Sequence, residues 1–329
     1  MKYVDFGKTG EKVSELCLGT MMFGMRCDQA EADRILGTAI EHGISFIDTA
    51  AMYAQGGTEE ILGRIVKGRR DKLFIGTKVD KGVDAHSILS SIEESLSRLQ
   101  LDYVDLYMIH WPVAGMRPEE MMAALNQVVS AGKARYVGCC NYPAWLVAHS
   151  NAIAQQNGWP QLICNQIAYN LIERGVEIEI LPQAIVEQIA ITAYRPLVAG
   201  LLAGKYRAGQ AISTDTRAQT DARLLTWLAM FGDRVEKFNQ IAAERNLHPA
   251  QLAIAWVRSS PAVTAPIVGV SSLSQLETSL SAFEIDLTAG EVEELNYLFD
   301  TEIFEEGLQL FPGLMYNFPR LRRNLTLLG

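Results

Sequence analysis

Leu106-Tyr107-Met108-Ile109-His110-Trp111 is a short apolar run that ends abruptly in a histidine and a tryptophan. Its composition predicts a strand that is buried on both faces, as the strands of parallel sheets are. In α/β folds the residues that carry chemistry lie at the C-terminal ends of such strands. His110 is therefore a candidate functional residue, and its meaning depends on whether other strands of the chain end in matching groups.

A pattern of apolar strand, loop and amphipathic helix repeats along the chain in units of about 30 residues. The eight predicted strands span residues 16–19, 46–48, 73–77, 104–110, 136–139, 162–166, 189–194 and 263–268. Strict alternation of strands and helices implies parallel pairing, and eight units is the number that closes a (β/α)8 TIM barrel. An open, doubly wound sheet is the alternative, but the Gly-x-Gly-x-x-Gly of that fold is missing after the first strand.

The ends of the chain and one connection fall outside this pattern. Residues 2–6 and 12–16 predict a β-hairpin, because Gly7-Lys8-Thr9-Gly10 supplies its turn. A long polar connection at residues 200–223 follows the seventh strand, ahead of a helix predicted at 233–244. The tail at residues 300–329 is unusually apolar, so we predict that it covers the pocket or contacts another subunit. No linker separates these parts, and we predict one domain over residues 1–329.

The composition excludes several classes of protein. The 329 residues carry a net charge of −9, and the chain lacks the basic face that nucleic-acid binding needs. Its five cysteines are odd in number and form no Cys-x-x-Cys motif, which favours a reducing compartment. The sequence shows neither a signal peptide nor an apolar run that could span a membrane. We therefore predict a cytoplasmic monomer or homo-oligomer that has no nucleic-acid, membrane or metal partner.

Three more ionisable residues are predicted at the same end of the barrel as His110. Asp48 ends the second strand, Tyr53 lies in the loop after it, and Lys78 ends the third strand. Each residue alone indicates little, because an aspartate after a strand is often a helix cap and a tyrosine near a rim often packs. The set is more specific, since four groups of different type end neighbouring strands around one mouth.

These four groups suit the donation of a proton to a carbonyl oxygen. A tyrosine hydroxyl titrates near ~10, and a nearby cation lowers that pKa by favouring the phenolate. Lys78 can supply the cation, and Asp48 can keep a buried lysine charged. His110 can hydrogen-bond the carbonyl oxygen and orient it. The side chains cannot supply the hydride that a reduction needs, so a cofactor is required.

The residues around these positions resemble the aldo-keto reductase superfamily over nearly the whole chain. The matching motifs are Gly43-Ile44-Ser45-Phe46-Ile47-Asp48-Thr49-Ala50-x-x-Tyr53, Thr77-Lys78, Asp102-Tyr103-x-Asp105-Leu106-Tyr107-x-Ile109-His110-Trp111, Gly132-Lys133-x-Arg135-Tyr136-x-Gly138, Asn165-Gln166 and Gly200-Leu201-Leu202-x-Gly204-Lys205-Tyr206. The resemblance implies a (β/α)8 barrel and NADPH-dependent carbonyl reduction. It carries over Tyr53 as general acid/base, with Lys78 and Asp48 as its tuning pair. His110 is implied to orient the substrate.

The same resemblance places the nicotinamide carboxamide against Asn141 and Gln166, with Tyr194 stacked under the ring. Barrel enzymes bind phosphate at the loops after strands seven and eight, often at a helix N-terminus. Strand eight runs into Gly269-Val270-Ser271-Ser272 and a helix, so free backbone N–H groups and two hydroxyls are expected to face the phosphates. The full predicted cofactor set is Thr20, Met21, Asp48, Asn141, Gln166, Tyr194, Arg195, Pro196, Leu197, Gly200, Leu201, Gly269, Ser271, Ser272 and Gln275.

The predicted phosphate site departs from the family pattern. Arg195 stands where relatives commonly have serine. No basic residue accompanies Ser271 and Ser272, where relatives often pair one with the 2′-phosphate of NADPH, and Ser279 stands where many have an asparagine for the adenine. Losing a guanidinium removes a strong charge-assisted contact. We therefore predict a weaker preference for NADPH than usual, with NADH also used, and expect Arg195 to grip the pyrophosphate or a substrate anion.

The substrate is predicted to contact Met21, Tyr53, His110 and Trp111. The wall around it is expected to include the apolar residues Met22, Phe23, Tyr142 and Trp145. Such a wall suits an aldehyde, a ketone or the apolar face of a sugar. Two alternatives to carbonyl reduction stay open. One is the NAD-linked oxidation of a sugar or polyol, and the other is a cofactor-binding regulatory subunit similar to the potassium-channel β subunits.

Overall fold

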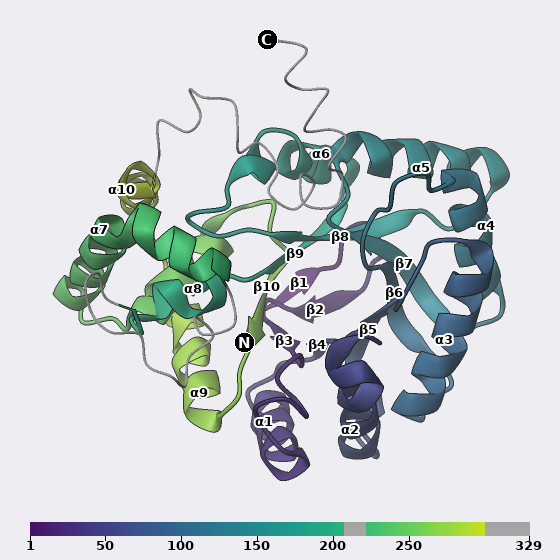
Figure 1. The fold of residues 1–329 in the computed structure, drawn as a ribbon, viewed down its shortest axis with the longest axis horizontal. Helices are drawn as coiled ribbons and strands as arrows, with labels where there is room; N and C mark the ends of the chain where they lie inside the picture. Colours follow the sequence, from purple (N-terminus) through teal and green to yellow (C-terminus); the bar gives the residue numbers. More distant parts are fainter. Residues whose placement is uncertain (207–221, 300–329) are drawn as a thin grey trace.

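A closed barrel of eight parallel strands forms the centre of the molecule, which confirms the predicted fold class (Figure 1). The computed structural model describes residues 1–206 and 222–299, so the predicted roles of the tail at 300–329 and of the connection at 207–221 lie outside the described residues. The first and last strands pair with each other, which closes the ring. In chain order the strands are β3 (Cys17–Gly19), β4 (Phe46–Asp48), β5 (Phe74–Lys78), β6 (Val104–Ile109), β7 (Ala134–Cys140), β8 (Leu162–Ala168), β9 (Ala190–Tyr194) and β10 (Ala265–Gly269).

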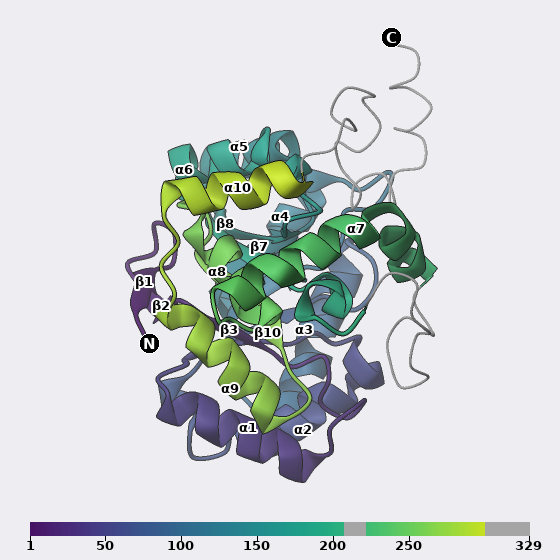
Figure 2. The same cartoon turned by 90° about the vertical axis from the view of Figure 1, so that its left-hand side faces the viewer.

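Helices surround the barrel, because each has an apolar face to bury against the strands. In the helix at 85–99, for example, Ile88, Ile92 and Leu99 are all fully buried on one face. Figure 2 shows α9 lying along α1, and α10 beside α7. The helices are α1 (Gln29–Glu41), α2 (Gly57–Ile65), α3 (Ala85–Leu99), α4 (Pro118–Ser130), α5 (Ala144–Asn157), α6 (Ile180–Glu187), α7 (Ala222–Glu244), α8 (Pro249–Ser259), α9 (Leu273–Ser281) and α10 (Ala289–Phe299).

A β-hairpin packs against the N-terminal end of the barrel. Its strands, β1 (Tyr3–Asp5) and β2 (Lys12–Ser14), pair antiparallel, as the sequence predicts. The Phe6 ring packs against Phe46 and Phe74 at the starts of β4 and β5, with ring centroids 5.5 and 4.8 Å apart. This packing fills the N-terminal end of the barrel and leaves the C-terminal strand ends as the place for a ligand.

Two helices differ from the prediction. α7 begins at Ala222 instead of residue 233, because Leu224 and Phe231 continue its buried face toward the N-terminus. The structure also adds α10, whose buried face includes Leu295 and Phe299. The connection predicted from residue 200 includes the end of a 3-10 helix, η4 (Val198–Ala203). Within residues 1–206 and 222–299, no helix has the length and apolarity that crossing a membrane requires.

Candidate active site

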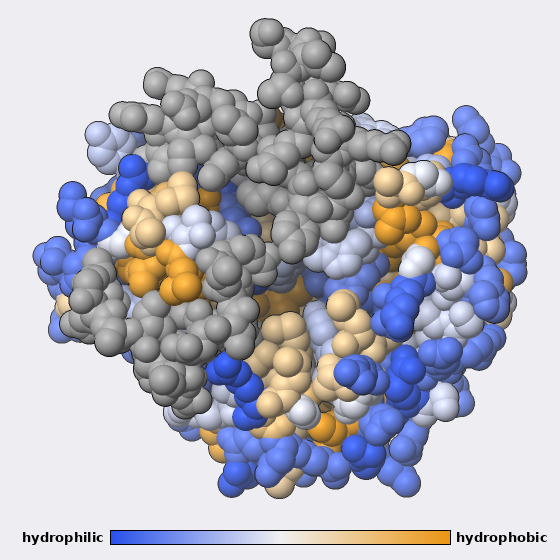
Figure 3. All heavy atoms as spheres, viewed as in Figure 1, coloured by the Kyte–Doolittle hydropathy of each residue, from blue (hydrophilic) through white to orange (hydrophobic). Residues whose placement is uncertain are grey.

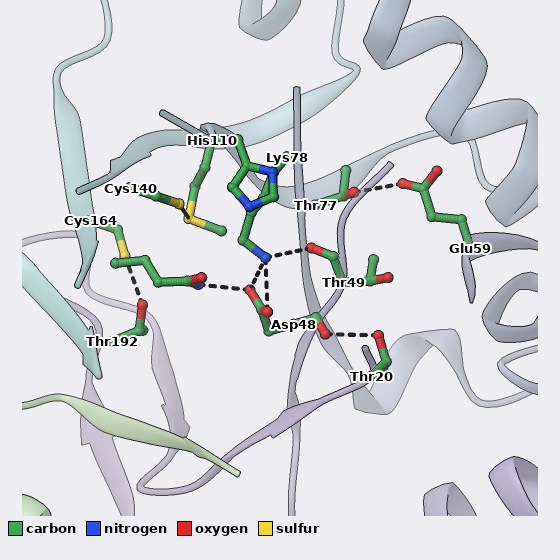
Figure 4. A network of polar contacts seen from close by, with 12 residues as sticks. Thr20, Asp48, Thr49, Glu59, Thr77, Lys78, His110, Cys140, Cys164 and Thr192 are labelled. Atoms are coloured by element: carbon green, nitrogen blue, oxygen red, sulfur yellow. Dashed lines mark hydrogen bonds and ion pairs between the residues drawn. The ribbon is translucent and has the colours of Figure 1, made fainter. Parts of the chain in front are cut away.

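Asp48 and Lys78 form a buried ion pair at the C-terminal ends of β4 and β5 (Figure 4). The two strands are hydrogen-bonded neighbours, which brings the side chains together. The Lys78 ammonium donates to both Asp48 carboxylate oxygens at 2.8 Å and to the Thr49 carbonyl at 2.7 Å. Lys78 is fully buried and Asp48 is 3% exposed, so each charge depends on the other for compensation.

This pairing keeps Lys78 in its charged form. Burial alone lowers the pKa of a lysine, because the ammonium loses its hydration. The Asp48 carboxylate opposes that effect both by its charge and by its hydrogen bonds, and together with smaller contributions from neighbouring groups it leaves the pKa of Lys78 raised. Gln166 supports the carboxylate from β8, since its side-chain N–H donates to Asp48 at 2.8 Å. A fixed positive charge therefore lies at the C-terminal end of the barrel.

Tyr53 begins a 3-10 turn, η1 (Tyr53–Gly56), that connects β4 to α2. The Lys78 nitrogen lies 5.1 Å from the centroid of the Tyr53 ring. Burial raises the pKa of Tyr53 to about 12, while Lys78 opposes this rise and Asp48 adds to it. The net direction differs from the predicted lowering, because burial penalises the phenolate and the adjacent carboxylate offsets part of the lysine charge.

His110 follows β6 directly and faces Tyr53, with the two ring centroids 6.2 Å apart. Burial, and then the charge of Lys78, lowers the pKa of His110 to about 3, so the imidazole is neutral at pH 7. Its Nδ1 atom is buried and has no hydrogen-bond partner among the residues that the structure describes. A neutral imidazole carries one N–H donor, which suits a hydrogen bond to a carbonyl oxygen.

The three residues expected around a nicotinamide ring come from adjacent strands. Asn141 follows β7, Gln166 lies on β8 and Tyr194 ends β9. The Tyr194 hydroxyl donates to the Asn141 side-chain oxygen at 2.8 Å, and the Asn141 side-chain nitrogen donates to the His110 carbonyl at 3.4 Å. Because Gln166 also donates to Asp48, the structure links all three residues to the strand-end groups.

Arg195 follows β9 and has a φ of 61°, in the left-handed region. Its guanidinium carbon lies 4.8 Å from the Trp227 ring centroid on α7, and Nη1 lies 4.0 Å from the Glu173 carboxylate. Its Nη2 atom is buried without a hydrogen-bond partner in the described part of the chain. Val198 and Ala199 also have positive φ, which is a marked outlier for a β-branched residue. This loop therefore combines a strained backbone with a cation that has unused donors.

The loop after β10 differs from the prediction of free backbone donors. Ser272 caps α9, and the Ser271 backbone N–H donates to the Gln275 side chain at 3.0 Å. The Leu273 backbone N–H donates to the Glu31 carboxylate of α1 at 3.1 Å. Two of the expected donors therefore already have acceptors. Glu31 lies 242 residues earlier in the chain than Leu273, so no local pattern indicates this contact.

Comparison with known proteins places the chain in a family. The model of the Aldo/keto reductase family matches residues 15–299. The chain belongs to the aldo/keto reductase family. Its relatives include an uncharacterized oxidoreductase, YrpG, of Bacillus subtilis, which is 34% identical over 91% of this chain and 96% of its own length. A probable voltage-gated potassium channel subunit beta of Arabidopsis thaliana is 35% identical over 87% and 92%, and norsolorinic acid reductase A of Aspergillus parasiticus is 30% identical over 96% and 85%.

As an aldo/keto reductase, the protein is an NAD(P)H-dependent oxidoreductase with carbonyl reduction as its general activity. Membership of the family agrees with the fold, since the matched region begins just before β3 and ends with α10. The Arabidopsis thaliana relative shows that this family also includes proteins named as probable subunits of a potassium channel.

The apolar wall predicted for this aldo/keto reductase is only partly available to a ligand. Met21 and Trp111 are half-buried. Phe23 and Tyr142 are fully buried, and the Tyr142 hydroxyl lies 3.2 Å from the Met121 sulfur, so both belong to the core. In the space-filling view the surface is hollowed near its centre, where apolar residues are visible in the depth and hydrophilic residues beside them (Figure 3).

The predicted cofactor residues of the reductase also divide by exposure. Thr20, Pro196 and Leu201 are buried, and the Thr20 hydroxyl donates to the Asp48 carbonyl at 2.9 Å. Asp48, Asn141 and Gln166 are buried as well. The residues that keep exposed surface are Met21, Tyr194, Arg195, Leu197, Gly200, Gly269, Ser271, Ser272 and Gln275. The Thr49 carbonyl and the Glu31 carboxylate were both missed by sequence reasoning. The first acts through its backbone, and the second comes from a distant helix, so residue type gives no signal for either.

Proposed function

We propose that this reductase converts the carbonyl of an aldehyde, ketone or sugar to the alcohol, with Tyr53 as the general acid. The observation that carries the proposal is the grouping around Tyr53. The charged Lys78 lies against its ring and the neutral His110 faces it. When bound, NADPH or NADH supplies the hydride that goes to the carbonyl carbon.

Tyr53 donates the proton in this mechanism. Its pKa is raised to about 12 by burial, so the hydroxyl is protonated at neutral pH. It gives that proton to the carbonyl oxygen as negative charge develops there. Lys78 then stabilises the phenolate that remains, because its own charge is held in place by Asp48.

His110 orients the substrate in this mechanism. Its pKa is lowered to about 3, so the imidazole donates a hydrogen bond to the carbonyl oxygen without acting as a competing acid. Tyr53 and His110 then contact the same oxygen from two sides. Two fixed contacts at one atom set the direction of the carbonyl group, which favours a reactive orientation.

The residues at the C-terminal ends of β7, β8 and β9 fit a nicotinamide dinucleotide. Asn141 and Gln166 offer amide groups for the carboxamide, and Tyr194 offers a ring for stacking. The buried, unpartnered Nη2 of Arg195, on the described part of the loop after β9, is a donor without an acceptor, which suits an anionic pyrophosphate. Ser271 and Ser272 add hydroxyl groups at the start of α9.

The contact between Glu31 and Leu273 supports the use of NADH beside NADPH. A carboxylate already occupies the N-terminus of α9, where the helix dipole would otherwise favour a phosphate. If the 2′-phosphate of NADPH lies near Ser271 and Ser272, it meets this negative charge. NADH lacks that phosphate and avoids the repulsion.

A turnover assay tests the function. Purified protein is assayed with a panel of aldehydes, ketones and sugars and with each reduced cofactor. Tyr53→Phe should lower kcat by about 10²–10⁴-fold and leave the cofactor Kd unchanged. Tyr142→Phe is the matched control, because it removes a core hydroxyl and should leave kcat unchanged. Full activity of Tyr53→Phe would exclude the assigned acid.

Two other functions are separated by the same assay. The match to potassium channel β subunits favours a regulatory subunit, which would bind cofactor tightly and show no turnover with any member of the panel. The position of Glu31 favours NAD-linked oxidation of a sugar or polyol, which would show faster turnover with NAD and an alcohol than in the reductive direction. The predicted cytoplasmic location remains a prediction.

A further inference from the structure

The connection that carries Tyr53 is fixed on both sides by two consecutive residues of β5 (Figure 4). Lys78 donates to the carbonyl of Thr49, which precedes Tyr53 in the chain. The Thr77 hydroxyl donates at 2.6 Å to the carboxylate of Glu59, which follows Tyr53. Successive residues of a strand point to opposite faces, so Lys78 reaches the barrel interior while Thr77 reaches the helix layer. One strand therefore fixes both flanks of the connection.

Glu59 lies in the first turn of α2, and its side chain is fully buried. One carboxylate oxygen accepts from Thr77, and the other accepts from the Arg98 guanidinium of α3 at 2.7 Å. A buried carboxylate is costly unless it is paired and hydrogen-bonded, so the three side chains depend on one another. We refer to Glu59, Thr77 and Arg98 as the Glu59 cluster. It joins α2, β5 and α3 behind the catalytic groups.

The backbone between Tyr53 and α2 is strained. Ala54 and Gln55 have φ values of 47° and 56°, and Gly56 has a φ of 93°. Left-handed conformations are unfavourable for residues with a Cβ and persist only where the surroundings enforce them. A Cβ built on Gly56 would lie 2.7 Å from the Arg98 side chain, so Arg98 packs directly on this turn. The Glu59 cluster is thus part of the surroundings that hold the turn.

From these contacts, and resting on the proposed role of Tyr53, we propose that Glu59, Thr77 and Arg98 are positioning residues for the proton donor. They fix α2 and the η1 turn relative to β5, and so set the place of the Tyr53 hydroxyl relative to Lys78. Misplacing a reacting group by about 1 Å can cost about a hundred-fold in rate. Loss of the Thr77–Glu59 hydrogen bond therefore lowers kcat and leaves cofactor affinity unchanged.

A purely structural role gives a different result, and Tyr107 allows the two to be separated. Tyr107 pairs with Thr77 across β5 and β6, and its buried hydroxyl donates to the Ile88 carbonyl of α3 at 2.9 Å. It therefore makes the same kind of contact between the strand and helix layers. That contact goes to α3, which does not carry Tyr53. If the Thr77 hydroxyl served stability alone, its removal would resemble the removal of the Tyr107 hydroxyl.

The test compares Thr77→Val, which removes the hydroxyl and keeps the shape, with Thr77→Ser, which keeps the hydroxyl. We expect Thr77→Val to lower kcat about ten-fold or more, with the Kd for NADPH and NADH unchanged. Thr77→Ser should recover most of the kcat. Tyr107→Phe should lower Tm about as much as Thr77→Val does, with kcat unchanged. Wild-type kcat in Thr77→Val, or equal kcat losses in Thr77→Val and Tyr107→Phe, would overturn the proposal.

Glu59→Gln provides a second measurement on the same cluster. The amide oxygen still accepts from Thr77, but the neutral side chain no longer compensates Arg98. We expect kcat to fall, and Tm to fall further than in Thr77→Val. If Glu59→Gln does not fold, the comparison of Thr77→Val with Thr77→Ser still tests the proposal. Wild-type turnover distinguishes this proposal from the function that underlies it. A wild type without carbonyl turnover refutes both, whereas an active wild type with a fully active Thr77→Val refutes only the positioning role.

Discussion

The two sides of the barrel mouth are built in different ways. On the side of β4 to β6, the Asp48–Lys78 pair is complete before any ligand binds, because the Lys78 ammonium donates to both carboxylate oxygens and to the Thr49 carbonyl. On the side of β9 and β10, the described loops combine left-handed backbone with an Arg195 guanidinium that leaves one nitrogen without a partner. In the proposed mechanism the first side is preorganised for proton transfer, whereas the Arg195 guanidinium of the second side offers a donor to an anionic ligand.

The sharpest test of this contrast is to neutralise one buried acid on each side. Asp48→Asn removes the compensating charge from a fully buried lysine, and we expect a loss of about 3–5 kcal/mol in the free energy of unfolding. Glu173→Gln acts on the looser pair with Arg195, where the charged atoms are 4.0 Å apart. There we expect a loss of about 1 kcal/mol. Urea unfolding of both variants measures the difference.

An exposed ion pair provides a reference for the losses in unfolding free energy expected of Asp48→Asn and Glu173→Gln. Asp5 pairs with Lys12 at 2.9 Å, and both side chains are mostly exposed. Asp5→Asn should cost less than about 1 kcal/mol, because solvent already screens the pair. Similar losses in unfolding free energy for Asp48→Asn and Glu173→Gln would contradict the distinction between the side of β4 to β6 and the side of β9 and β10.

A smaller effect concerns the neutral state of His110. Its pKa is lowered to about 3 in the folded protein, whereas a histidine in the unfolded chain titrates near ~6.5. At pH values between these two pKa values, the histidine is therefore protonated in the unfolded state and neutral in the folded state. The stability that this difference supplies is present above the unfolded pKa and is lost as the pH falls toward the folded pKa.

Between pH 7 and pH 5 the resulting loss for the wild type is about 2 kcal/mol. His110→Gln should lack this part of the pH dependence, because glutamine does not titrate. Unfolding free energies of both proteins at the two pH values provide the measurement. Parallel pH profiles for wild type and variant would show that the first side of the mouth does not hold the imidazole in its neutral form.

The contrast also explains how far the sequence could predict the site. The positions of Asp48, Lys78 and His110 were predictable because the end of a strand follows from local periodicity, and Tyr53 was predictable as a residue of the loop after the second barrel strand. Their grouping then followed from the closure of the barrel, which eight repeats already indicated. The pKa of Tyr53 was not predictable in its net direction, because it depends on how much burial outweighs the charge of Lys78.

The second side was harder to predict, because contacts between distant segments decide its chemistry. The start of α9 offers free backbone donors when its sequence is considered alone. In the structure, Glu31 of α1 takes one of these donors, and Gln275 takes another. The left-handed Val198 gives no sequence signal either, since a β-branched residue favours other conformations. Packing between distant segments therefore decides which donors are free at the start of α9, and the local sequence pattern could not predict this.

The smallest predicted effect tests what Glu31 does on that second side. Glu31→Gln keeps an oxygen that can accept from the Leu273 N–H, and it removes the negative charge from the start of α9. It also frees Arg34, whose guanidinium pairs with this carboxylate, to contact a phosphate. We expect affinity for 2′,5′-ADP to rise about five-fold relative to 5′-AMP, which corresponds to about 1 kcal/mol. Quenching of tryptophan fluorescence on titration measures both constants.

The comparison of the two nucleotides isolates the effect of the 2′-phosphate. A general change of net charge would raise the affinities for 2′,5′-ADP and 5′-AMP to a similar degree. Glu41→Gln is the matched control, since it removes one carboxylate from the other end of the same helix. It should leave the ratio of the two affinities unchanged. A Glu31→Gln variant with the wild-type ratio would show that the 2′-phosphate does not approach α9. The proposed binding of the cofactor phosphates would then rest on Arg195 and the loop after β9.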